Sequence, residues 1–210
     1  MRIVLLGAPG AGKGTQAQFI AQKYHIPNIS TGEILRKLIY KNTVLNKKID
    51  YSMHSGKLIS DDIITTLIRD RITCLDCKPG FILDGFPRTI VQAKMIEEEK
   101  IDIDYIIELK IPTKIILKRI QNRRTNSIEK KIQCLQNGNY PTNNSFLAER
   151  VDDKEKIVKI RLHEYEKFTI PLINYLKNDT KVKKFKYCIL DGTKNIKNIH
   201  KDIKKILDVH

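Results

Sequence analysis

The chain has 210 residues, a mass of 24.4 kDa, a formal net charge of +15 and an isoelectric point near 9.6. A chain of this length can bury a hydrophobic core without a metal or a disulfide. No apolar run approaches the roughly 20 residues that cross a bilayer, and no secretory signal is evident, which excludes a membrane protein and favours the cytoplasm. Four scattered cysteines, Cys74, Cys77, Cys134 and Cys188, are typical of reduced thiols in that compartment.

The excess of positive charge suggests nucleic acid as a partner, because clustered lysines release counterions when they bind phosphates. The lysines are densest in the last third of the chain, where they alternate with Ile and Asn rather than with aromatic residues. No nucleic-acid-binding motif accompanies them. We therefore expect a solvated basic surface and no nucleic-acid partner.

Residues 7–15 follow an apolar, β-branched run at residues 2–6 and read Gly-Ala-Pro-Gly-Ala-Gly-Lys-Gly-Thr. The run is typical of a buried strand, and the glycines after it let successive backbone N–H groups turn toward an anion. A helix beginning there would point its positive end at the same anion, to which Lys13 adds a charge. The segment predicts a phosphate-binding loop. Gly14 stands where the Walker pattern has the Ser or Thr that holds magnesium, and Thr15 follows one position later, so the magnesium ligands stay open.

Helices and strands alternate along the next hundred residues. Helical spacing of apolar residues predicts helices over residues 15–24, 44–55, 89–100 and 112–123, one that begins at Ser30 or Thr31, and one that Asp61 caps. Short apolar runs predict strands over residues 81–83 and 105–111, and residues 25–28 are expected to form a short return. This alternation indicates a parallel sheet covered by helices on both faces.

The chain changes character between residues 122 and 153, where Asn is frequent and periodicity is weak, as in long lids and binding loops. Helical periodicity returns over residues 154–176, with a bend expected at Pro171. A last strand over residues 185–190 and an amphipathic helix close the chain.

Residues 84–88 read Asp-Gly-Phe-Pro-Arg and follow a predicted strand, as the phosphate-binding loop does. The carboxyl ends of parallel strands meet at one edge of a sheet, where ligands bind. Asp84 would stand there as a hard oxygen ligand for Mg²⁺, directly or through water. Arg88 would clamp a phosphate through its planar fork of donors.

These motifs resemble bacterial adenylate kinases of the long-lid type, within the nucleoside monophosphate kinase family. The resemblance covers nearly the whole chain except the lid, through residues 7–15, 29–36, 56–59, 84–89, Gln92, 119–124, 150–153, 161–165 and 191–194. It implies an α/β three-layer P-loop fold with a central parallel sheet, helices on both faces and two mobile inserts. The core would comprise residues 1–29, 60–121 and 154–210, with an AMP-binding insert at 30–59 and a lid at 122–153.

The resemblance also implies an activity: reversible, Mg²⁺-dependent phosphoryl transfer from ATP to AMP, giving two ADP, in a monomer. The catalytic cations would be Lys13, Arg88, Arg123, Arg150 and Arg161. ATP would contact Gly10, Ala11, Gly12, Lys13, Gly14, Thr15, Arg119, Arg123 and Lys194. AMP would contact Thr31, Arg36, Lys57, Leu58, Ile59, Gly85, Phe86, Pro87, Arg88, Gln92, Arg150 and Arg161, with Thr31 and Gln92 reading its adenine.

The lid departs from the family pattern, in which four cysteines bind zinc or a polar network replaces them. Cys134 is the lone cysteine of residues 122–153, so we expect no structural zinc. Three other functions stay open. One is a kinase of the same fold that acts on UMP or CMP, against which Thr31 and Gln92 argue. Another is a basic nucleic-acid-binding protein without catalysis, against which Lys13, Asp84 and the arginines argue. The third is a structural nucleotide sensor that binds nucleotides without phosphoryl transfer.

Overall fold

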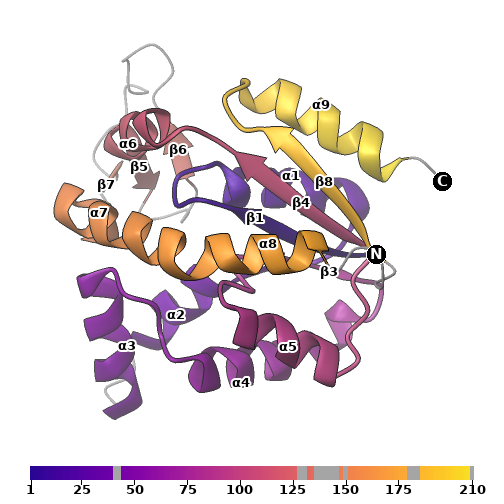
Figure 1. The fold of residues 1–210 in the computed structure, drawn as a ribbon, viewed down its shortest axis with the longest axis horizontal. Coiled ribbons are helices and arrows are strands. Elements are labelled where there is room, and N and C mark those ends of the chain that lie inside the picture. The colour runs from indigo at the N-terminus through magenta and orange to yellow at the C-terminus, as the bar shows by residue number, and fades with distance from the viewer. Residues whose placement is uncertain (40–43, 127–131, 135–146, 149–150, 179–184, 209–210) are drawn as a thin grey trace.

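The computed structural model describes residues 1–39, 44–126, 132–134, 147–148, 151–178 and 185–208. Its centre is a five-stranded sheet with strand order β2-β3-β1-β4-β8, in which every pair is parallel. The strands are β1 (Arg2–Gly7), β2 (Asn28–Ser30), β3 (Phe81–Asp84), β4 (Tyr105–Lys110) and β8 (Lys186–Asp191). The predicted α/β sheet with helices on both faces is confirmed (Figure 1).

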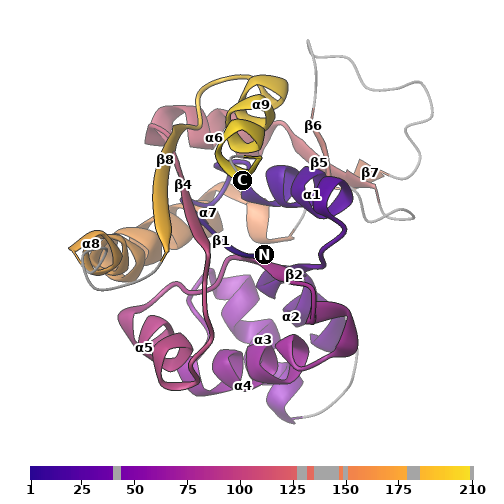
Figure 2. The same ribbon diagram turned by 90° about the vertical axis from the view of Figure 1, so that its right-hand side faces the viewer.

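Helices cover the two faces of the sheet in separate groups (Figure 2). α1 and α9 pack on one face, whereas α4, α5 and α8 build the core on the other, from which α2 and α3 extend. Every helix among the described residues is too short or too polar to cross a membrane. The helices are α1 (Lys13–Tyr24), α2 (Thr31–Ile39), α3 (Val44–Ser55), α4 (Asp61–Ile72), α5 (Ile90–Glu98), α6 (Thr113–Gln121), α7 (Glu155–Glu164), α8 (Ile170–Asn178) and α9 (Ile196–Leu207).

Successive side chains of a strand point to opposite faces of the sheet, and in the central strands the side chains on both faces are mostly apolar. In β1, Ile3 and Leu5 join the core beneath α1 and α9, whereas Val4 and Leu6 join the core beneath α5 and α8. This is why the strands appear in the sequence as continuous apolar runs rather than as alternating patterns. The rigid sheet fixes where the loops after β1 and β3 lie.

Four local features differ from the sequence expectations. Residues 28–30 form the edge strand β2, which begins where the short return expected over residues 25–28 ends. Ser60 rather than Asp61 takes the N-cap position of α4. The helix that begins at Glu155 passes through a π-helical turn at Tyr165–Thr169 before Pro171. This wider turn accommodates the proline ring without breaking the helix.

The fourth difference lies in the predicted lid, where three short strands form an antiparallel sheet of order β6-β5-β7. They are β5 (Arg123–Asn126), β6 (Ile132–Cys134) and β7 (Leu147–Ala148), and a 3₁₀ turn at Val151–Asp153 follows them. Strands of two to four residues are too short to show a period of two in the sequence. The remainder of the lid, including Arg150, lies outside the described residues.

A buried carboxylate ties α8 to the sheet. Glu108 of β4 is 5% exposed and accepts hydrogen bonds from Tyr187 Oη at 2.7 Å and from Lys177 Nζ at 2.8 Å. Burial, together with the hydrogen bond to Glu108, raises the pKa of Tyr187 above its usual value. A buried charge is tolerated only when hydrogen bonds replace its water, so each donor here stabilises the fold.

We predict that Tyr187→Phe lowers the free energy of unfolding by about 1–3 kcal/mol, because it leaves one lone pair of Glu108 without its donor. Urea denaturation followed by circular dichroism measures the effect. Tyr51→Phe is the matched control, since the side chain of Tyr51 is 69% exposed and its change should be near zero. Equal stability of Tyr187→Phe and wild type would contradict a stabilising role for this contact.

Candidate active site

The phosphate-binding loop connects β1 to α1, and the side chain of Lys13 folds back onto the backbone of the loop. Lys13 Nζ donates hydrogen bonds to the carbonyl oxygens of Gly7 at 2.6 Å and of Ala8 at 2.9 Å. Gly10 has a φ of +82°, and a Cβ there would lie 2.8 Å from Ile120, so only glycine fits. α1 begins at Lys13, which puts the positive end of the helix dipole at the loop.

A cavity of about 900 Å³ opens in front of this loop. Its wall includes the loop, the end of β3, α6 and the start of α9. All the residues that the resemblance assigns to ATP line it together: Gly10, Ala11, Gly12, Lys13, Gly14, Thr15, Arg119, Arg123 and Lys194. The chain also contributes residues that the sequence analysis did not single out, namely Gln16, Gln18, Ile115, Lys118, Asn122 and Asn198.

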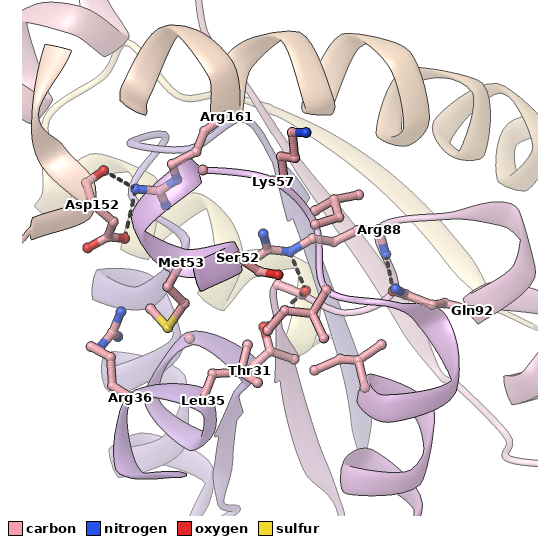
Figure 3. A pocket seen from close by; sticks show the side chains of 16 residues that line it. Thr31, Leu35, Arg36, Ser52, Met53, Lys57, Arg88, Gln92, Asp152 and Arg161 are labelled. Carbon is pink, nitrogen blue, oxygen red and sulfur yellow. Dashed lines mark hydrogen bonds and ion pairs between the residues drawn. The ribbon is translucent and has the colours of Figure 1, made fainter. Parts of the chain in front are cut away.

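A second cavity of about 90 Å³ adjoins the first, between α2, α3 and the loop after β3 (Figure 3). Most residues assigned to AMP line it: Thr31, Arg36, Lys57, Leu58, Ile59, Gly85, Arg88, Gln92 and Arg161. Leu35, Ser52 and Met53 line it too, although the sequence analysis missed them. Phe86 is fully buried in the core, and Pro87 lines a small neighbouring pocket. The side chains of these two residues therefore do not line the second cavity.

The turn after β3 is held by one carbonyl group. The Gly85 oxygen accepts hydrogen bonds from Arg88 Nε at 2.7 Å and from Thr31 Oγ1 at 3.1 Å (Figure 3). Gly85 has a φ of +83°, and a Cβ there would lie 2.8 Å from Thr31 Oγ1. The Phe86–Pro87 peptide bond is cis. This arrangement fixes where the Arg88 guanidinium stands relative to the floor of the second cavity.

Two arginines near the lid are paired with adjacent acids. Arg123 Nε donates to Asp153 Oδ2 at 2.6 Å, and its Nη2 contacts the other oxygen of the same carboxylate. Arg161 Nη1 lies 2.9 Å from Asp152 Oδ2, and Figure 3 shows this pair beside the second cavity. These acids have no role predicted from the sequence, in which their only signal is their place shortly after Arg150 in the motif of residues 150–153.

The cations of the site lower one another's pKa. Burial lowers the pKa of Lys13 to about 8, and Arg88, Arg161 and Arg123 add to that shift while Asp84 opposes it. Burial and the nearby Arg161 lower the pKa of Arg88 to about 10. The pKa of Arg161 is also lowered, mainly by burial. A bound polyanion would relieve both the desolvation and the repulsion, so the site is built to take phosphates.

Asp84 has a carboxylate at the wall of the larger cavity that could hold a metal ion. It ends β3, the strand next to β1, lines the larger cavity and exerts its field on Lys13 and Arg88. A hard oxygen donor beside a phosphate site suits Mg²⁺, which is commonly held by one or two carboxylates plus phosphates and water. Within the described part of the chain, no group of three or more His, Cys, Asp or Glu residues could hold a metal by itself.

Two adjoining cavities that share Arg36, Arg88 and Arg161, one of them fronted by a P-loop, define an enzyme that moves a phosphoryl group between two phosphorylated substrates. Residues 5–181 match the family model described as adenylate kinase. An adenylate kinase of Photorhabdus laumondii is 43% identical over 215 residues, an alignment that covers 99% of this chain and 100% of the relative. The chain therefore belongs to the adenylate kinase family and is a phosphotransferase.

We predict that anion binding takes up a proton near pH 8. About half of Lys13 is neutral there in the free protein, and a bound polyphosphate favours its charged form, so uptake should approach about 0.5 proton per site. The affinity should weaken as the pH rises above 8. Calorimetry with ATP as the anionic probe, in buffers of different ionisation enthalpy, measures both quantities. Lys13→Arg keeps its charge and should show no uptake in this range, and uptake that persists in this variant would assign it to another group.

Proposed function

We propose that this enzyme transfers the terminal phosphoryl group of ATP to AMP, reversibly, giving two ADP. The larger cavity would hold ATP with its phosphates on residues 7–15, and the smaller cavity would hold AMP. The observation that carries the proposal is that the cavities meet at Arg36, Arg88 and Arg161, beside Lys13. A phosphoryl group moving between two nucleotides would pass through this junction.

For phosphoryl transfer, the protein mainly has to align the two nucleotides and supply positive charge. Phosphoryl transfer passes through a loose transition state whose charge is spread over the equatorial oxygens. Fixed donors in a water-poor site stabilise such charge at little reorganisation cost. Lys13, Arg88, Arg123, Arg150 and Arg161 would supply these donors, and Arg36 with Arg88 would hold the AMP phosphate. Arg119 would pack against the base of ATP, with Lys194 nearby.

Mg²⁺ would be held near Asp84 together with the nucleotide phosphates, and when bound it would neutralise charge on those phosphates. The support is the position of the Asp84 carboxylate at the wall of the larger cavity. The hydroxyl group of Thr15, one residue after Gly14 in the phosphate-binding loop, is a second oxygen donor at the wall of the same cavity.

We also propose that residues 30–59 and the lid at 122–153 move as inserts on a core of residues 1–29, 60–121 and 154–210. Arg123 and Arg161 stand at the lid side and are paired with Asp153 and Asp152. Substrate phosphates would compete with these carboxylates for the guanidinium groups. On closure, the two arginines would therefore exchange their carboxylate partners for substrate phosphates.

The enzyme is further proposed to be a cytoplasmic monomer that uses neither zinc nor a nucleic-acid partner. Residues 122–153 contain a single cysteine, Cys134, which cannot supply the usual four-ligand zinc site. Groups for both nucleotides come from one chain, so the reaction needs no second subunit.

The test is an acceptor assay with ATP and Mg²⁺, in which AMP, UMP, CMP and GMP are compared by coupling ADP formation to a dehydrogenase. We predict that kcat/KM for AMP exceeds that of each other acceptor by at least about 100-fold, because a side-chain amide can pair with adenine by two hydrogen bonds that guanine and uracil do not match, and the size of the base distinguishes adenine from cytosine. Preference for UMP or CMP would select the alternative kinase. No turnover, together with salt-sensitive RNA binding, would select the nucleic-acid-binding alternative.

We predict that Arg88→Lys lowers kcat by about 10²–10³-fold, because a lysine cannot reproduce the planar fork on a phosphate and the loss falls in the transition state. Steady-state kinetics with both nucleotides varied measures it. Arg69→Lys is the matched control, since Arg69 is half exposed on α4 and paired with Glu99 at 2.7 Å, and its kinetics should stay those of the wild type. Wild-type kcat in Arg88→Lys would remove Arg88 from the proposed machinery.

A further inference from the structure

The side-chain amide of Gln92 is held at both ends. Gln92 lies on α5, is 2% exposed and lines the smaller cavity. Its Nε2 donates a hydrogen bond to Asp61 Oδ1 at 2.7 Å. Its Oε1 accepts a hydrogen bond from the backbone N of Arg88 at 2.7 Å (Figure 3).

The chemistry of these two partners permits one orientation of the amide. An ionised carboxylate only accepts hydrogen bonds, and a backbone N–H only donates. Turning the amide over would set two acceptors against each other at Asp61 and two donors against each other at Arg88. A buried polar group that is left unpaired loses the hydrogen bonds it would make to water, so the turned amide is strongly disfavoured.

Asp61 is itself held in place by the start of α5. Thr89 Oγ1 donates to the same Asp61 oxygen at 3.0 Å and accepts from the backbone N of Gln92 at 3.1 Å. The carboxylate, the hydroxyl and the amide thus form a closed set of contacts between α4 and α5. This explains why Asp61, expected to cap α4, leaves that position to Ser60.

The fixed amide leaves one N–H donor and one oxygen lone pair for a ligand. Adenine presents an amino donor beside a ring-nitrogen acceptor, which matches this pair. Hypoxanthine, guanine and uracil present a carbonyl acceptor beside an N–H donor, which is the reverse pattern. Cytosine presents the same order as adenine, so the size of the base, not this amide, would have to exclude it.

We propose that Asp61 is a specificity-determining positioning residue: it fixes the orientation of the Gln92 amide so that the acceptor cavity takes a 6-amino purine rather than a 6-oxo purine. Asp61 acts through Gln92 and does not touch the base. This inference rests on the proposed function, since it assigns the smaller cavity to the acceptor nucleotide.

Asp61→Asn tests it, because an asparagine amide can donate as well as accept and thereby permits the turned Gln92. The measured quantity is the ratio of kcat/KM for AMP to kcat/KM for IMP. We expect this ratio to fall about tenfold, roughly the penalty of one unpaired buried group, since the clash at Arg88 remains. The fall should appear mainly as a lower KM for IMP, with KM for ATP and kcat nearly unchanged.

Two matched variants separate positioning from loss of stability or charge. Asp62→Asn removes the same charge one residue later in the first turn of α4, where Asp62 is exposed. Thr89→Val removes the hydroxyl from the contact set and should lower the melting temperature, but leaves the carboxylate and the amide. Both should keep the wild-type AMP to IMP ratio. Should Asp61→Asn fail to fold, Asp61→Ser, which also removes the carboxylate, is assayed in its place.

The outcomes separate this inference from the proposed function. A wild-type enzyme that forms no ADP from ATP and AMP overturns the function itself. An active wild type with an unchanged ratio in the Asp61 variant overturns only the role of Asp61. An equal fall of the ratio in Thr89→Val would show that general loosening of α5 relaxes base choice, and would overturn it as well.

Discussion

Repulsion among cations held at one edge of a parallel sheet is the constraint on which this molecule depends. Lys13, Arg88 and Arg161 each have a lowered pKa because burial removes water and neighbouring cations add to the cost. The protein offsets part of the cost with carbonyl oxygens at Lys13 and with Asp152 and Asp153 at the two lid-side arginines. An incoming anion would relieve the remaining cost, so the burial and mutual repulsion of these cations favour the binding of phosphates.

The hydrophobic sheet is what makes this concentration of charge possible. Its central strands β1 and β3 carry apolar side chains on both faces, and both cores pack against them, so the strand ends cannot separate to let the cations move apart. Parallel pairing then brings the loops after β1 and β3 to the same edge, although about 75 residues separate them in sequence. Glu108 and its two donors fasten α8 to the same sheet.

Features that depend on local sequence could be predicted, and those that depend on distant partners could not. The strand before residues 7–15, the loop itself and the bounds of α3 follow from short-range patterns, and the structure reproduces them. The strands β5, β6 and β7 are too short for a readable period. Asp61 shows the limit of prediction from local sequence most clearly. Local rules favour Asp61 as the N-cap of α4, but its carboxylate instead accepts a hydrogen bond from Gln92, 31 residues away. The roles of the site residues stay predictions, because likeness of sequence implies them and geometry only brings the residues together.

Charge and base choice are handled by different parts of the site, and the physics requires this separation. A cluster of cations attracts any phosphate with similar strength whatever base it carries, so it cannot distinguish one nucleotide from another. Discrimination needs neutral groups whose donors and acceptors have a fixed order, and an amide has such an order only when something prevents its rotation. An unpaired carboxylate inside the cavity would repel the phosphates as well as orient the amide, and Asp152, which does line the cavity, is paired with Arg161. Asp61 contacts Gln92 from α4, while the cations of the junction come from other elements, so orientation is gained without weakening the field that draws the phosphates in.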